Sequence, residues 1–174
     1  QKTFYKQKFV DMGFRLSGNA LIGVGIGLVF TMAVLLLHYG VPLKLGFLQL
    51  AVNSRGPGAG PSFQDVLMVM ATGGAVMFLP VLFGEELVFR GYILPKFAKA
   101  MGSFKAVVLS SAVFALWHLP AYFSIYRGGA AEGGFSDVAL MLFAHGISAI
   151  PLCLLYLTTR ELYGVSLYHA LVDV

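Results

Sequence analysis

The chain has 174 residues, of which 58% are hydrophobic and 11% are charged, and its formal net charge is +4 at pH 7. Its mean hydropathy is +0.81, whereas ordinary soluble domains are about half apolar and about a quarter charged. This composition excludes an ordinary soluble domain and indicates an integral membrane protein. The positive charges form no run with interleaved aromatic residues, as nucleic-acid surfaces do, so we expect membrane lipids and no nucleic acid among the partners.

Four apolar segments are long enough to cross a bilayer, whose hydrocarbon core of about 30 Å requires about 20 residues of helix. They cover residues 18–38, 63–94, 104–123 and 137–159, and we expect a fifth span, truncated in this sequence, over residues 162–174. Polar and glycine-rich stretches separate them, and we find no internal repeat and no alternation typical of strands. We therefore predict an all-α fold, a polytopic transmembrane helical bundle that forms one domain over residues 1–174.

Lysine and arginine residues predict the orientation of this bundle, because cytoplasmic connections carry an excess of them. Two segments are rich in these residues, with Lys2, Lys6, Lys8 and Arg15 near the N-terminus and Lys96, Lys99 and Lys105 after the second span. The alternating connections hold fewer, namely Lys44 and Arg55 in one and Arg127 in the next. We predict a multi-pass protein of the cell (inner) membrane, with the N-terminus, residues 95–105 and Arg160 on the cytoplasmic side.

Small residues in the first span predict close helix packing. Gly23 and Gly27 are four residues apart in an apolar helix, a spacing that lets two helix backbones approach closely. No strand precedes these glycines, so we exclude a nucleotide-binding loop. The single cysteine, Cys153, lies in an apolar stretch, and we expect it to be a buried core residue.

The stretch GEELVFRGYILPKF, residues 84–97, places Glu85, Glu86 and Arg90 within the second apolar segment. A charged residue at the centre of a membrane helix costs about 2.5–3.5 kcal/mol on insertion scales, so such residues are functional candidates by default. Glu86 and Arg90 are four residues apart and share a helix face, which predicts an ion pair. Glu85 points about 100° away from Glu86 on an α-helix. We therefore assign Glu85 to chemistry and the pair to structural support.

The third and fifth segments each bring a histidine to a similar depth. His118 lies thirteen residues beyond Lys105, and His169 lies eight residues beyond Glu161. At 1.5 Å per residue, both lie roughly 12–20 Å into the membrane. Asp173 follows His169 by four residues and shares its helix face. Three segments therefore contribute ionisable groups at one level of the membrane.

A purely structural polar network is the alternative interpretation of these groups. Taken together, they are Glu85, Glu86, Arg90, His118, His169 and Asp173. His38 lies near a helix end and His145 has no acidic partner in its own helix, so we interpret both as ordinary hydrogen-bonding residues. Chance scatter does not favour a carboxylate and two imidazoles at one depth, so we interpret the six as a functional set.

Three short motifs connect these residues to a known family. The first is two glutamates, three residues and an arginine; the second is a phenylalanine, three residues and a histidine; the third is a histidine, three residues and an asparagine or aspartate. They occur here as EELVFR (Glu85, Glu86 and Arg90), FALWH (Phe114 and His118) and HALVD (His169 and Asp173). In these motifs the sequence resembles the CAAX protease and bacteriocin-processing family, also called the Abi family, and its type II CAAX prenyl proteases. The resemblance covers residues 84–174.

The resemblance implies an intramembrane endopeptidase whose glutamate and histidines line a cavity open to the cytoplasmic side. In a glutamate-type mechanism, Glu85 is the general base for a water that His118 also holds, and His169 and Asp173 stabilise the oxyanion. In a metal-dependent mechanism, Glu85, His118 and His169 bind a divalent ion such as zinc and leave a position for water. The chain contains no HExxH, and we favour the mechanism without a metal.

Two functions of other classes remain as alternatives. One is a catalytically inactive membrane scaffold or immunity protein of the same fold, and the other is a proton or ion pathway lined by Glu85, His118 and His169. An inactive relative is expected to lose motif residues, whereas all six positions hold suitable types here, which favours the enzyme. The implied partners are peptide or lipidated protein substrates. No motif in the sequence indicates specificity for a prenyl group or for a particular peptide.

Overall fold

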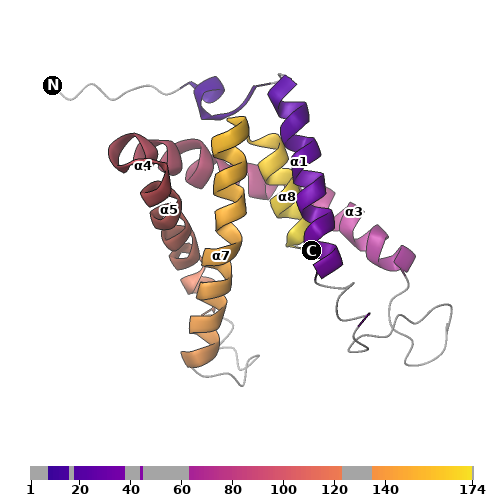
Figure 1. Cartoon of the computed structure of the whole chain (residues 1–174). Coiled ribbons are helices and arrows are strands. Elements are labelled where there is room, and N and C mark those ends of the chain that lie inside the picture. The colour runs from indigo at the N-terminus through magenta and orange to yellow at the C-terminus, as the bar shows by residue number, and fades with distance from the viewer. Residues whose placement is uncertain (1–7, 16–17, 38–43, 45–62, 123–134, 174) are drawn as a thin grey trace.

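The computed structural model describes residues 8–15, 18–37, 44, 63–122 and 135–173, and all statements about structure below concern these residues. They form helices and contain no strand, which confirms the predicted all-α bundle. Several residues discussed above lie outside the described part of the chain, namely Lys2, Lys6, His38, Arg55 and Arg127. Figure 1 shows the helices side by side, with the two ends of the bundle at the top and bottom of the view.

Three helices among the described residues are long and apolar enough to cross a membrane: Leu67–Met101, Ser103–Tyr122 and Ser136–Thr159. They overlap with α3 (Phe63–Pro80), α5 (Ser103–Trp117) and α7 (Phe135–Thr159), respectively. The first apolar segment forms α1 (Gly18–Leu35), preceded by a short 3-10 helix, η1 (Phe9–Met12). Large apolar side chains on the outer faces of these helices are exposed, as lipid-facing surfaces require, for example Leu21, Val76, Leu140 and Phe143.

The second apolar segment forms one long helical run with a change of pitch in its middle. α3 continues into the π-helical segment η3 (Val81–Ile93) and then into α4 (Leu94–Met101). Pro80 ends α3, and because proline has no backbone N–H to donate to the preceding turn, an α-helical ladder is interrupted at this point. The run extends past the predicted end at residue 94, because Pro95 occupies the first turn of α4, where a missing N–H is tolerated.

The last apolar segment forms α8 (Tyr163–Val172), a short helix in the interior of the bundle. Its ten residues span about 15 Å, less than a bilayer requires, so the described part of this segment does not cross the membrane. α8 packs most extensively against α1 and also against α3. A Cβ added to Gly27 would lie 2.6 Å from the Gly164 carbonyl oxygen, which confirms that the glycines of α1 allow close packing.

The hydrophobic core lies where α8 meets η3, α5 and α7. Leu94, Ala106, Leu162 and Val165 are completely buried there. Cys153 is also 0% exposed, as expected for a core residue, and its Sγ lies 3.9 Å from Ser111 Oγ. The core therefore fixes the positions of η3 and α8 relative to each other, and these two elements carry most of the polar cluster.

Candidate active site

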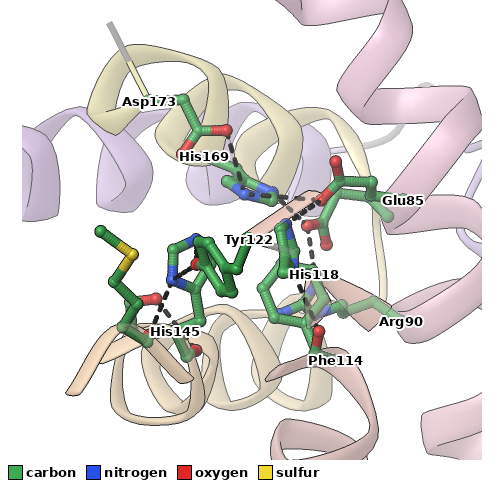
Figure 2. Close-up of polar contacts among 11 residues, drawn as sticks. Glu85, Arg90, Phe114, His118, Tyr122, His145, His169 and Asp173 are labelled. Carbon is green, nitrogen blue, oxygen red and sulfur yellow. Dashed lines mark hydrogen bonds and ion pairs between the residues drawn. The ribbon is translucent and has the colours of Figure 1, made fainter. Parts of the chain in front are cut away.

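Three elements bring the six candidate residues together in one cluster. Glu85, Glu86 and Arg90 lie on η3, His118 follows the last residue of α5, His169 lies on α8, and Asp173 follows α8 directly. Figure 2 shows Glu85, His118 and His169 pointing toward one another from three helices, with Asp173 on the far side of His169. The cluster therefore assembles from parts of the chain that are far apart in sequence.

The π-helical turn places two adjacent carboxylates around one imidazole. Glu86 Oε1 lies 2.6 Å from His169 Nδ1, and Glu85 Oε2 lies 3.8 Å from His169 Nε2. π-Helical turns are rare in proteins overall, but those that do occur are often found at functional sites. The wider turn of η3 places both side chains within reach of His169. The contact between Glu86 and His169 was not predicted from α-helical spacing.

Glu86 and Arg90 form the predicted ion pair, at 2.8 Å between Glu86 Oε1 and Arg90 Nη1. Both side chains are 0% exposed, and a buried charge without its partner is strongly destabilising. Glu86 Oε2 and the Nε and Nη2 atoms of Arg90 are buried and have no hydrogen-bond partner in the part of the chain that the structure describes. Buried polar groups of this kind commonly bind internal water.

Phe114 separates these charged groups from the apolar core. The Arg90 guanidinium carbon lies 4.3 Å from the centre of the Phe114 ring, a cation–π contact of about 0.5–2 kcal/mol. The ring also contacts His118 and His169 edge-on, with ring centres 4.7 and 5.6 Å away. Phe114 of the FALWH motif therefore packs against residues from both other motifs, which explains the need for an aromatic side chain at this position.

The end of α5 orients His118. Pro120 has no N–H to continue the helix, and the His118 N–H donates to the Ala115 carbonyl at 3.1 Å. The Phe114 carbonyl, which an α-helix would pair with that N–H, instead accepts a hydrogen bond from His118 Nδ1 at 2.9 Å. A carbonyl oxygen only accepts, so the proton of a neutral ring is on Nδ1. The Nε2 lone pair then faces Glu85.

A small gap separates Glu85 from both histidines. Glu85 Oε2 lies 3.9 Å from His118 Nε2 and 3.8 Å from His169 Nε2. These distances are too long for direct hydrogen bonds, but one water molecule can contact groups at such separations. The Glu85 Oε2 atom is buried and has no hydrogen-bond partner among the described residues, whereas the side chains of Glu85 and His118 as a whole are 25% and 20% exposed. The geometry therefore leaves an unpaired carboxylate oxygen facing the two Nε2 atoms across the gap.

Asp173 contacts the remaining nitrogen of His169. Its Oδ2 lies 3.3 Å from His169 Nε2, and its backbone N–H donates to the His169 carbonyl at 3.1 Å. The imidazole therefore has Glu86 on one nitrogen and Asp173 on the other, with Glu85 further away. A ring that carries protons on both nitrogens can donate to both carboxylates, whereas a neutral ring can donate to only one.

The free donor atoms around the gap are also of the types that bind zinc. Zinc takes histidine nitrogen and carboxylate oxygen ligands at about 2.0–2.2 Å, so two ligands of one ion lie at most about 4 Å apart. The Phe114 carbonyl contacts His118 Nδ1 and leaves its Nε2 available, an arrangement common for metal-bound histidines, whereas Nε2 of His169 is already contacted by Asp173 Oδ2 at 3.3 Å. Among the described residues, however, no three His, Cys, Asp or Glu side chains already have the geometry of a metal site.

Two polar residues that the sequence did not single out for the site border the cluster. The His145 ring on α7 lies against His118, with ring centres 4.4 Å apart, and the Tyr122 hydroxyl contacts both nitrogens of His145. His145 was interpreted as an ordinary hydrogen-bonding residue, and it does make hydrogen bonds. The sequence of α7 did not indicate that His145 lies beside His118, because this contact joins two different helices.

Comparisons with known proteins identify the family. A model of the family described as Type II CAAX prenyl endopeptidase Rce1-like matches residues 65–174, more than half of the chain and all six residues of the cluster. Comparisons with curated proteins and with solved structures gave no match. The chain therefore belongs to the Rce1-like family of type II CAAX prenyl endopeptidases.

Proposed function

We propose that this protein is an intramembrane endopeptidase in which Glu85 activates a water molecule for attack on a peptide bond. The observation that supports this most directly is the placement of Glu85 Oε2, 3.9 Å from His118 Nε2 and 3.8 Å from His169 Nε2. A general base must lie within hydrogen-bond reach of the proton that it removes, directly or through one water. Glu85 meets this condition for a water in the gap.

The proposed reaction has two steps. The water donates one hydrogen bond to Glu85 and one to the Nε2 lone pair of His118. Glu85 takes a proton from the water while the water oxygen forms a bond to the scissile carbonyl carbon, and the carbonyl π electrons move onto its oxygen. When the carbonyl re-forms, the C–N bond breaks and its electron pair stays on the nitrogen. Protonated Glu85 then transfers its proton to the leaving amine, which returns the glutamate to its starting state.

His169 and Asp173 stabilise the oxyanion in this proposal. A developing oxyanion is stabilised by fixed hydrogen-bond donors, and loss of one donor costs about 10²–10³ in kcat in well-studied cases. The Nε2 atom of His169 faces the gap, and a proton on this atom would be the donor. In the resting site Asp173 Oδ2 lies 3.3 Å from the same atom, so it holds the ring in place until the Nε2 proton is donated to the oxyanion instead. Glu86 holds the other side of the ring.

The proposed substrates are peptide segments of membrane-associated or lipidated proteins. The three long apolar helices place the cluster in a membrane protein, and the family to which the chain belongs is described as prenyl endopeptidases. The charge distribution further suggests entry from the cytoplasmic side. In a metal-dependent version of the same reaction, Glu85, His118 and His169 would hold a divalent ion such as zinc, which would polarise the carbonyl and the water.

The direct test is hydrolysis by the purified protein in detergent. We expect cleavage of quenched fluorescent peptides with a C-terminal CAAX sequence, assayed with and without a farnesyl group on the cysteine. Glu85→Gln should lower kcat at least about 10²-fold, because the amide cannot act as a general base. Asp137→Asn, the same change at an exposed acid in the first turn of α7, should retain activity.

Two further measurements separate the alternatives. Metal analysis of the active protein, followed by chelation with 1,10-phenanthroline, distinguishes the mechanisms, since only the metal-dependent one predicts a stoichiometric ion and loss of activity. Ion flux in sealed vesicles tests a proton or ion pathway. Full activity of Glu85→Gln would overturn the role of Glu85, and a wild-type protein that cleaves neither peptide set would favour an inactive scaffold.

A further inference from the structure

We infer that Tyr122 and His145 position the catalytic imidazole of His118, an inference that rests on the proposed peptidase function. No motif described above includes either residue. Figure 2 shows the two side chains next to each other beside His118, on the side away from Glu85. Tyr122 as a whole is 9% exposed, and its hydroxyl group contacts the ring of His145.

The hydrogen bonds of His145 use both of its ring nitrogens. Nδ1 lies 3.0 Å from the Met141 carbonyl oxygen, and because that oxygen only accepts, we assign the proton to Nδ1. The Tyr122 hydroxyl lies 3.0 Å from Nε2 and 2.5 Å from Nδ1. In the assigned tautomer the hydroxyl donates to Nε2. Neither nitrogen is then left to bind substrate, so His145 acts through the position of its ring.

The ring of His145 covers one face of His118. The two ring centres are 4.4 Å apart and the planes are tilted by 43°, a distance at which the rings are in van der Waals contact. Phe114 contacts His118 edge-on at 4.7 Å, and its carbonyl accepts from Nδ1. His118 has no direct hydrogen bond on Nε2, so these contacts define the direction in which that atom points.

Tyr122 links the two helices that carry the histidines. It lies four residues after His118 and one helical turn beyond the end of α5, and its backbone N–H donates to the His118 carbonyl at 3.3 Å. Its hydroxyl reaches His145 on α7. A single residue therefore holds both the backbone of His118 and the ring that covers it. Small displacements of a catalytic group lower the rate steeply, by about 10²-fold for 1 Å.

The kinetic test uses three variants and a matched control. We expect His145→Ala to lower kcat about ten- to a hundred-fold with little change in KM, because it affects alignment and not substrate binding. His145→Phe keeps a ring against His118 and should retain more activity than His145→Ala, and Tyr122→Phe, which lacks only the hydroxyl, should lie between wild type and His145→Ala. Phe143→Ala removes an exposed ring from the same helix and should leave kcat unchanged.

A spectroscopic readout keeps this test independent of activity. In protein labelled with ¹⁵N-histidine, the His118 signals, identified by their loss in His118→Gln, should report a proton on Nδ1. We expect them to shift toward a tautomer mixture in His145→Ala and to remain unchanged in Phe143→Ala. Unchanged His118 signals and unchanged kcat in His145→Ala would overturn the inference. A wild-type protein without peptidase activity would overturn the proposed function but not this inference, because the ¹⁵N signals of His118 still test whether His145 and Tyr122 position its ring.

Discussion

Glu86 is a fully buried carboxylate whose Oε1 contacts both Arg90 Nη1 and His169 Nδ1, at 2.8 and 2.6 Å. Adjacent Glu85 is partly exposed and makes no direct hydrogen bond through Oε2. The two glutamates are identical in chemistry and neighbours in sequence, yet the structure gives Glu86 two hydrogen-bonding partners and leaves Glu85 Oε2 facing a gap. Their roles therefore differ because of their surroundings, and a matched pair of substitutions can separate stability from catalysis.

We expect Glu86→Gln to destabilise the protein by about 3–5 kcal/mol, because it leaves the Arg90 charge buried without its partner. The measurement is unfolding in detergent by heat or sodium dodecyl sulfate, followed by the fluorescence of Trp117, the single tryptophan. Glu85→Gln is the control, since it makes the same chemical change one residue earlier and should have a much smaller effect on unfolding. Equal unfolding midpoints for Glu86→Gln and wild type would contradict the role of Glu86 in the buried network.

At this scale, helical spacing predicted the contacts within one helix and missed those between helices. The Glu86 to Arg90 pair and the His169 to Asp173 contact both join residues four apart, a distance that any helix brings onto one face. The bond between His169 and Glu86 joins residues 83 positions apart. The sequence showed that these groups reach the same depth, but only packed helices determine which of them touch.

Among the helices, the pairing of α1 with α8 depends on glycine. Gly23 and Gly27 of α1 face the start of α8, and a Cβ on Gly27 would lie 2.6 Å from the Gly164 carbonyl oxygen. Backbone atoms cannot rotate away as a flexible side chain can, so any larger residue here must separate the two helices. Helix association in membranes relies on such close packing, because lipid is as apolar as the side chains themselves.

We expect Gly27→Ala to lower the free energy of unfolding by about 1–3 kcal/mol, the usual cost of forcing extra volume into a packed interface. Gly25→Ala is the control on the same helix, because no heavy atom lies within 4 Å of a Cβ at Gly25. That change should be neutral or stabilising, since alanine favours a helix by up to about 1 kcal/mol over glycine. The same unfolding assay measures both variants. A Gly27→Ala protein as stable as the Gly25→Ala protein would mean that α1 and α8 do not pack through these glycines.

The positions of helices could be predicted where the local sequence pattern determines them, but not where packing between helices determines them. Apolar length located the long helices, and the glycine spacing identified the packing face of α1. The π-helical pitch of η3 had no sequence pattern beyond Pro80 at its start. The apolar composition of residues 162–174 predicted a helix there, and α8 is that helix, but composition did not indicate that α8 packs against α1 and α3.

At the scale of the whole molecule, the cationic residues gather at one end of the bundle. η1, α4 and the end of α7 lie together at the top of Figure 1, and these segments carry or adjoin Lys8, Arg15, Lys96, Lys99, Lys105 and Arg160. Lys96 Nζ lies 3.8 Å from the ring centre of Tyr92, where the aromatic ring and the ammonium group suit a membrane–water interface. Connections rich in Lys and Arg are retained in the cytoplasm, so we predict that this end is cytoplasmic.

Labelling of introduced cysteines tests that orientation. Cys153→Ser removes the single native cysteine, which is buried. In this background, Lys99→Cys provides one exposed thiol on α4, and Ser136→Cys provides one at the start of α7, at the other end of the bundle. In intact bacterial cells whose outer membrane has been made permeable, a membrane-impermeant maleimide should label Ser136→Cys. Lys99→Cys should react only after the inner membrane is opened, because the cationic end faces the cytoplasm. The reverse pattern would place α4 outside the cell. It would contradict the orientation predicted from the charge distribution, and with it the proposal that substrates enter the site from the cytoplasm.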